Sequence, residues 1–267
     1  MIMNREMLSY FNLSEIPFTK EIPFDKLHLL PSVEKNVLSV KMLVELKGIG
    51  VMTGKSGSGK SCVLRLLKHQ LSSSIYKVLY ICHSSINVTE FYTHLSACLG
   101  LTSRGRRSTM FREIKEKILS LHSGHIHPVL IIDEADLLNY DILQDLRLLT
   151  NFDIDSLNAM TVLLCGQESL LQKFSLSILE PLANSIVVSI TVDPLPQEET
   201  YAFIEKRIKD CGNSAALFTK QALAVIHQAS GGIFRSIGTI AQSALYKAFL
   251  SKASEVEAEH VKSVIER

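Results

Sequence analysis

The sequence has no excess of charge, no paired cysteine motif and no long apolar run, and each absence excludes a class of protein. Its 28 lysines and arginines against 27 aspartates and glutamates leave a formal net charge of +1, so any nucleic acid must be bound by a local basic patch. The five cysteines are scattered and never form C-x-x-C, which is typical of reduced thiols in a cytosolic protein. No apolar run approaches the roughly 20 residues that span a bilayer, and no N-terminal signal pattern is present. We therefore expect a soluble, cytoplasmic protein.

A glycine-rich loop at residues 54–61 fits the phosphate-binding pattern G-x-x-x-x-G-K-[ST]. Apolar residues at 49, 51 and 52 predict a strand before it, and apolar residues at helical spacing follow it. Glycines allow the backbone N–H groups to turn toward phosphate oxygens, Lys60 supplies a charge for the β- and γ-phosphates, and the Ser61 hydroxyl is a ligand for Mg²⁺. The alternative is a structural glycine turn. The candidate nucleotide-binding residues are Gly54, Lys55, Ser56, Gly57, Ser58, Gly59, Lys60, Ser61 and Cys62.

A second acidic motif follows the predicted buried strand at 128–132. Asp133 at the strand tip is suited to hold the water shell of Mg²⁺, and Glu134 is suited to orient and deprotonate an attacking water. Another predicted strand, at 160–164, leads to Gln167, which is placed where ligands bind in open parallel sheets. Taken alone, Asp133 and Glu134 are consistent with an ordinary acidic strand end, and Gln167 with a polar turn residue. Together with the glycine loop, the acidic pair predicts nucleotide hydrolysis.

The remaining pattern predicts an α/β domain followed by a smaller helical one. Further strands are predicted over 77–82 and 186–190, and helices over 88–99 and 109–121. After Asp193 and Pro194 the pattern is helical, and Arg235 lies opposite the apolar stripe of its helix. Residues 1–35, with aromatic rings among prolines, favour an extended arm that lies beside a bound adenine or packs on the core. The predicted domains are 1–35, 36–194 and 195–267.

Two clusters of basic residues allow more than one interpretation. Arg104, Arg106 and Arg107 lie within four positions of one another and are either DNA-phosphate ligands or a solvated surface loop. Three histidines lie just before the strand at 128, but no cysteine or carboxylate accompanies them at ligand spacing. A polar connection into the strand explains these histidines better than a metal site. They are His122, His125 and His127.

Several segments together resemble AAA+ ATPases of the ExeA-like group. They are the two nucleotide motifs, Leu-Arg-Leu-Leu-Thr-Asn-Phe at 146–152, Leu-Leu-Cys-Gly-Gln at 163–167 and Gly-Gly-Ile-Phe-Arg-Ser-Ile at 231–237. The opening Pro-Phe-Thr-Lys-Glu-Ile-Pro at 17–23 is similar to the arms of ExeA-like proteins encoded beside transposases. More distant relatives are TnsC and MuB, which deliver target DNA to a transposase.

The resemblance implies a P-loop NTPase fold with a five-stranded parallel sheet sandwiched by helices and followed by a helical lid. It implies that residues 54–61 form the Walker A loop, that Asp133 and Glu134 form the Walker B pair, and that Gln167 and Arg235 are sensors 1 and 2. It also implies ATP and Mg²⁺ at a junction between protomers, in a ring or helical filament on duplex DNA. The basic loop falls where relatives approach the DNA backbone.

One segment departs from the family. Relatives usually carry an arginine before the fifth strand that reaches the neighbouring protomer's γ-phosphate, whereas residues 182–186 here contain none. An arginine finger is worth about 10³-fold or more in rate. Either another residue such as Arg147 substitutes for it, or hydrolysis is slow and the protein acts as an ATP-dependent assembly switch.

Our leading hypothesis is an ATP-dependent, DNA-binding regulator of transposition with a transposase as partner. The alternatives are an ExeA-type secretion ATPase, a helicase loader and a small-molecule kinase. The secretion proteins commonly continue into a membrane span and a peptidoglycan-binding region, and this sequence ends at Arg267 without either. Glu134 and the separate helical lid argue against the kinase.

Overall fold

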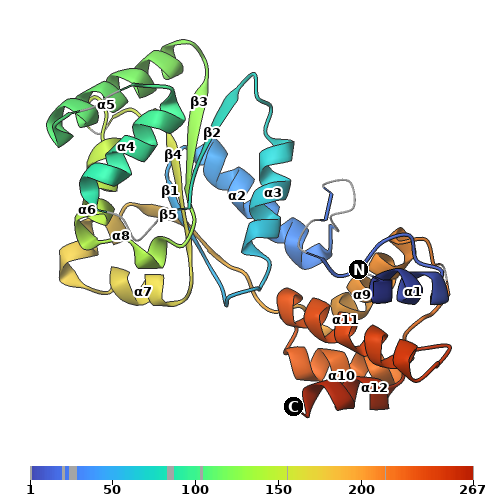
Figure 1. The fold of residues 1–267 in the computed structure, drawn as a ribbon. Helices are drawn as coiled ribbons and strands as arrows, with labels where there is room; N and C mark the ends of the chain where they lie inside the picture. The colour runs from blue at the N-terminus through green and yellow to red at the C-terminus, as the bar shows by residue number, and fades with distance from the viewer. Residues whose placement is uncertain are drawn as a thin grey trace. The chain divides into compact units, whose positions relative to one another are not determined.

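The computed structural model describes residues 2–19, 22–23, 29–82, 87–102, 105–154, 156–213 and 215–266. The chain divides into two compact units (Figure 1). The sheet unit consists of Lys35–Ser56 and Val63–Val192. The helical unit consists of Met1–Glu34, Gly57–Cys62 and Asp193–Arg267, so it includes the second half of the glycine-rich loop.

The sheet unit is built on a five-stranded parallel sheet with the strand order β2-β3-β4-β1-β5. The predicted strands are confirmed with ends shifted by one or two residues. The central strands β1, β3 and β4 are apolar runs that are buried throughout, whereas the edge strands β2 and β5 are only partly buried. The strands are β1 (Ile49–Thr53), β2 (Tyr76–Ile81), β3 (His127–Ile132), β4 (Thr161–Gly166) and β5 (Ile186–Thr191).

Helices cover both faces of this sheet, as in other parallel sheets (Figure 1). On one face the sheet packs on α4 (Val88–Leu99), α5 (Arg107–Ser123) and α6 (Tyr140–Thr150). On the other, Leu43 of α2 (Pro31–Leu46) lies directly over Gly50 of β1. The unit is completed by α3 (Lys60–Gln70) from Val63 onward, and by η2 (Ala135–Leu137), α7 (Ser169–Phe174), η3 (Ser177–Leu179) and α8 (Glu180–Ala183).

The helical unit contains the elements that follow Asp193. They are α9 (Gln197–Asp210), α10 (Lys220–Ser230), α11 (Phe234–Leu250) and α12 (Ala258–Ile265). The core of the unit includes Ile204, Leu223, Ile226, Ile237 and Leu245. Among the described residues, no helix is both long and apolar enough to cross a membrane.

The prediction of an extended N-terminal arm is wrong for residues 2–10. Ile2–Tyr10 form the helix α1, because the prolines at 17, 23 and 31 lie beyond this stretch and its methionines, glutamate and leucine favour helix. After α1, residues 11–19 are irregular, and they contact helices of their own unit. The Phe11 side chain is 4% exposed, and the Tyr10 ring meets the Phe249 ring at 5.6 Å. Phe24 lies outside the described residues.

Candidate functional site

The glycine-rich loop connects β1 to α3, as the motif requires. Gly57 has φ +79° and Gly59 has φ +108°. Residues that carry a Cβ rarely adopt such positive φ values. Lys60 is the first residue of α3, so the loop delivers the chain to a helix N-terminus, where free N–H groups favour an anion. The Ser58 side chain is 1% exposed, and its hydroxyl has no hydrogen-bond partner within the described residues. A phosphate group would satisfy such a donor.

Three predicted site residues lie at the carboxyl-terminal ends of the strands. Gly54 follows β1, Asp133 follows β3 and Gln167 follows β4. Because β3, β4 and β1 are neighbours in the parallel sheet, their carboxyl ends are adjacent, and Thr53 is in register with Gly166. The sequence therefore placed these residues on the sheet edge where α/β proteins bind ligands.

The Asp133 carboxylate is nearly buried, at 9% exposed, and is held by two hydrogen bonds. The Tyr80 hydroxyl donates to Oδ2 at 2.9 Å, and the Glu134 backbone N–H donates to Oδ1 at 3.0 Å. Burial of the phenol and its hydrogen bond to Asp133 raise the pKa of Tyr80 well above its usual value, so Tyr80 stays a donor. A carboxylate has about four acceptor sites, and lone pairs therefore remain for the water ligands of Mg²⁺.

Glu134 occupies an unusual backbone conformation. Its φ of 55° and ψ of 36° lie in the left-handed region, which a non-glycine residue adopts at a cost of order 1 kcal/mol. The side chain is exposed. The strand therefore turns sharply at its tip, and the second carboxylate is left accessible to a water molecule.

The next acidic residue, Asp136, ties the acidic motif to the end of β4. Its side chain is 8% exposed, and Oδ1 accepts a hydrogen bond from the Gln167 backbone N–H at 3.0 Å. A Cβ at Gly166 would lie 2.7 Å from this same Oδ1, so the contact requires glycine there. Asp136 thereby fixes the backbone from which the exposed Gln167 side chain projects.

Arg235 lies in the first turn of α11 and meets the phosphate loop through its backbone. Its N–H donates to the Gly57 carbonyl at 3.2 Å, while its side chain is exposed. A Cβ at Gly57 would lie 2.7 Å from the Arg235 Cβ, and one at Gly59 would lie 2.9 Å from the Phe234 ring. These contacts all lie within the helical unit.

The three arginines of the predicted basic loop differ in their surroundings. Arg104 lies outside the described residues, and Arg106 is exposed at the N-cap of α5. The guanidinium of Arg107 is ion-paired with Asp145 and lies 6.0 Å from the centre of the Tyr92 ring. Contact of these residues with DNA stays a prediction.

Arg107 belongs to a polar network inside the helical layer. Asp145 is 4% exposed and also accepts a hydrogen bond from the Tyr92 hydroxyl at 2.8 Å. Burial of the ring and this hydrogen bond raise the pKa of Tyr92, and the hydrogen bond from Arg107 to the carboxylate raises the pKa of Arg107. The network joins α4, α5 and α6.

His127 is not in a polar connection, as the sequence suggested, but is the first residue of β3. Its ring is buried, and Nε2 lies 2.9 Å from the Thr161 hydroxyl on β4. Burial lowers the pKa of His127 to about 4, with smaller contributions from Lys47 and His122. It is therefore a neutral core residue of the sheet.

Sequence reasoning missed Tyr80, Asp136 and Phe234. Tyr80 carries a hydroxyl between the apolar residues Leu79 and Ile81, and Asp136 completes the run Asp-Glu-Ala-Asp, so both left a weak signal. Phe234 left none, because an aromatic residue at a helix start usually packs in a core.

Comparisons with known proteins identify related sequences. A family model described as an AAA domain matches residues 44–174. The chain is 30% identical over 247 residues to the general secretion pathway protein A of Aeromonas hydrophila. The aligned region covers 90% of this chain and 44% of that protein. The chain thus spans less than half of this curated relative.

Solved structures with a similar fold include two ORC structures with DNA bound and a Holliday junction branch migration motor. Drosophila ORC bound to DNA superposes with a TM-score of 0.71 at 16% identity, over 97% of this chain and 65% of that one. Aeropyrum pernix ORC1 in complex with DNA gives 0.68 at 16% identity, over 93% and 67%. The RuvB branch migration motor of Thermotoga maritima gives 0.54 at 16% identity, over 94% and 73%. The predicted α/β P-loop fold, with a five-stranded parallel sheet flanked by helices, is confirmed.

Proposed function

We propose that this chain is an AAA+ ATPase that binds and hydrolyses ATP and assembles on duplex DNA in its ATP state. The observation that carries this proposal is the grouping of Gly54, Asp133 and Gln167 behind three adjacent parallel strands. A structural glycine turn would need neither the buried carboxylate of Asp133 nor the exposed one of Glu134.

Each residue has a role that follows from its chemistry. The backbone N–H groups of the loop and the N-terminus of α3 bind the phosphates, and Lys60 neutralises the β- and γ-phosphates. Glu134 accepts a proton from the attacking water, and Gln167 orients that water or the γ-phosphate. Arg235, whose backbone is fixed on Gly57, supplies positive charge to the phosphates.

Ser61 and Asp133 are the residues that would hold Mg²⁺. The lone pairs that remain on Asp133 fit the water ligands of a small hard cation, which keeps several waters when it binds to proteins. Bound there, Mg²⁺ would neutralise charge on the transferred phosphoryl group.

The proposed DNA partner is supported by the structural neighbours and by the basic residues. Two solved structures of similar fold are described as bound to DNA, and Arg106 presents an exposed guanidinium. With a formal net charge of +1, binding would depend on such local contacts and would be insensitive to base sequence and sensitive to salt.

The finer proposal is that the DNA-bound assembly delivers target DNA to a transposase. It is supported by the segment at 17–23, which resembles the arms of ExeA-like proteins encoded beside transposases. Since residues 182–186 contain no arginine, slow hydrolysis would favour a switch whose ATP state persists on DNA.

A second candidate is an ATPase that energises an envelope assembly. The 30% identity to general secretion pathway protein A over 90% of this chain favours it. The two candidates differ in their response to DNA, because only the first requires duplex DNA as a ligand.

The test is duplex-DNA binding, measured by fluorescence polarisation with ATP, ADP or no nucleotide. We expect ATP to promote binding, Lys60→Ala to abolish the effect of ATP, and Glu134→Gln to prolong the bound state. If DNA binding is absent in every nucleotide state while ATP is still hydrolysed, the DNA proposal fails and the second candidate is favoured. Absence of ATP binding by the unmodified protein would overturn the ATPase proposal itself.

A further inference from the structure

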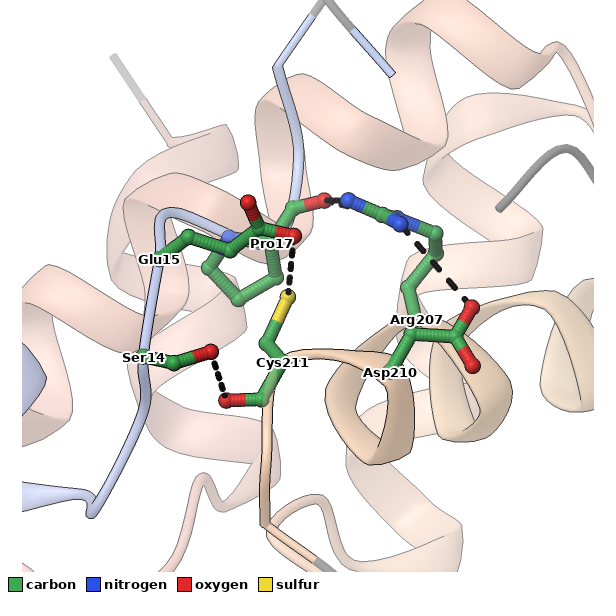
Figure 2. A network of polar contacts seen from close by, with 6 residues as sticks. All are labelled: Ser14, Glu15, Pro17, Arg207, Asp210 and Cys211. Carbon is green, nitrogen blue, oxygen red and sulfur yellow. Dashed lines mark hydrogen bonds and ion pairs between the residues drawn. The ribbon is translucent and has the colours of Figure 1, made fainter. Parts of the chain in front are cut away.

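The segment that follows α1 is fastened to the end of α9 by hydrogen bonds (Figure 2). Ser14 donates twice to the Cys211 carbonyl, from its backbone N–H at 2.7 Å and from its hydroxyl at 2.9 Å. Asn213 Nδ2 donates to the Phe11 carbonyl at 2.7 Å. These bonds join residues about 200 positions apart in the sequence. We call residues 11–18 the N-terminal strap.

Arg207 holds the far end of the strap. Its side chain is 1% exposed, and its Nε and Nη2 donate to the Pro17 carbonyl at 2.8 and 2.6 Å (Figure 2). The counter-charge is Asp210, whose Oδ2 lies 4.0 Å from Nη1. Burying a guanidinium against a neutral carbonyl costs desolvation energy that an apolar side chain would avoid. What Arg207 adds is a fixed position for Pro17 and for the residue that follows it.

That following residue, Phe18, begins a chain of aromatic contacts. The Phe18 ring lies 6.3 Å from the Phe203 ring of α9, and the Phe203 ring meets the Phe234 ring of α11 edge to face at 5.2 Å. A Cβ placed on Gly238 would lie 3.6 Å from the Phe18 Cβ. The strap therefore packs on α11 one turn beyond Phe234, on the same side of the helix.

The last contact in this series of aromatic side chains is that of Phe234 with the phosphate loop. Phe234 lies so close to Gly59 that an added Cβ would come within 2.9 Å of its ring, and the next residue donates its N–H to Gly57. The strap, α9, α11 and residues 57–62 all belong to the helical unit. A continuous set of packed side chains thus runs from the N-terminal strap to the backbone that would cradle the phosphates.

We propose that the N-terminal strap is a positioning element for the phosphate loop, acting through Phe18, Phe203 and Phe234, with Arg207 as its anchor. The strap holds the first turn of α11 against Gly57 and Gly59 and so keeps the loop in its binding conformation. Releasing the strap weakens nucleotide binding, because the loop must then be ordered when the ligand binds. The effect on ATP rests on the proposed function, whereas the coupling of strap to loop does not.

The test compares two phenylalanine variants of the helical unit. Phe18→Leu removes a ring of the aromatic chain, and Phe249→Leu removes a similarly half-buried ring that contacts Tyr10 instead. The first readout is hydrogen exchange of the amides at 57–62 without nucleotide. We expect exchange to rise about 5-fold or more in Phe18→Leu and to stay within 2-fold of the unmodified protein in Phe249→Leu. Equal loop exchange in Phe18→Leu and the unmodified protein would overturn the proposal.

The second readout is the Kd for ATP, measured by titration calorimetry on the same proteins. We expect Phe18→Leu to raise it about 5- to 10-fold and Phe249→Leu to change it less than 2-fold, with equal effects of both variants counting against the proposal. If the loop responds to Phe18→Leu but the unmodified protein binds no ATP, the coupling stands and the proposed ATPase function fails. Arg207→Met, which keeps the volume of the anchor, should reproduce the effect of Phe18→Leu wherever it folds.

Discussion

The two units of this protein place their functional groups in different ways. In the sheet unit, Asp133 and Gln167 are positioned by the strands that directly precede them. In the helical unit, we propose that the first turn of α11 is positioned by the strap, which lies more than 200 residues away in the sequence. The difference teaches that the chemical groups are set by local chain order, whereas the conformation of the phosphate loop depends on distant contacts. We expect variants in the sheet unit to change the rate of hydrolysis and strap variants to change affinity.

The largest expected effect is that of Glu134→Gln. The amide cannot accept the proton from water, so steady-state ATP hydrolysis should fall by roughly 10²- to 10⁴-fold while the Kd for ATP stays within about 2-fold. Rate and affinity are measured by phosphate release and calorimetry. The exposed Glu45→Gln on α2 is the control, and a parallel loss of affinity in Glu134→Gln would break the proposed division between the units.

Acid should destabilise the sheet unit through His127. The pKa of His127 is about 4 in the folded protein and about 6.5 when unfolded. At a pH between these two values, the unfolded chain therefore binds a proton at His127 that the folded protein does not bind. Stability is therefore present above about pH 6.5 and lost as the pH falls toward 4, by on the order of 3 kcal/mol.

This acid effect can be measured by urea unfolding between pH 7 and pH 4. His127→Gln, which keeps a polar partner for Thr161, should remove that part of the dependence. An unchanged pH slope in the variant would show that the acid sensitivity lies elsewhere.

Arg107→Ala should lower the free energy of unfolding by about 2 kcal/mol. The substitution leaves the buried Asp145 without its counter-charge, and the loss is below the 3–5 kcal/mol of a fully buried pair because Arg107 is 51% exposed. Arg112→Ala breaks an exposed ion pair on the same helix and should cost less than about 0.5 kcal/mol. Equal losses in urea unfolding would show that Asp145 needs no counter-charge.

The smallest expected effect is that of Arg106→Ala. If Arg106 neutralises one DNA phosphate, the slope of log affinity against log salt should become shallower by about 1, with no loss of stability. Lys68→Ala, which removes an exposed charge on α3, should leave the slope unchanged. The same slope in Arg106→Ala and the unmodified protein would remove Arg106 from the proposed DNA site.

The sheet unit could be predicted closely from the sequence. Its strands are short apolar runs bounded by polar residues, and the helix over 88–99 was predicted with the ends that the structure shows. The loop glycines at 57 and 59 have the positive φ values that the motif demands. In each case the signal lies within about ten residues of the structure it determines.

The rest could not be predicted, because its causes are distant in sequence or depend on geometry. The helix α1 was missed because the prolines beyond Phe11 dominated the composition of the first 35 residues. The anchor role of Arg207 depends on a carbonyl 190 positions away. Tyr80 reaches Asp133 only because β2 and β3 are paired.

The contact between Asp136 and Gly166 constrains how this protein can change by mutation. Since even a methyl group at residue 166 would collide with the Asp136 carboxylate, a larger residue there is tolerated only if the side chain at 136 is shortened or moved. Shortening residue 136 in turn releases the Gln167 backbone. Residues 136 and 166 must therefore change together, because a substitution at either position requires a compensating substitution at the other.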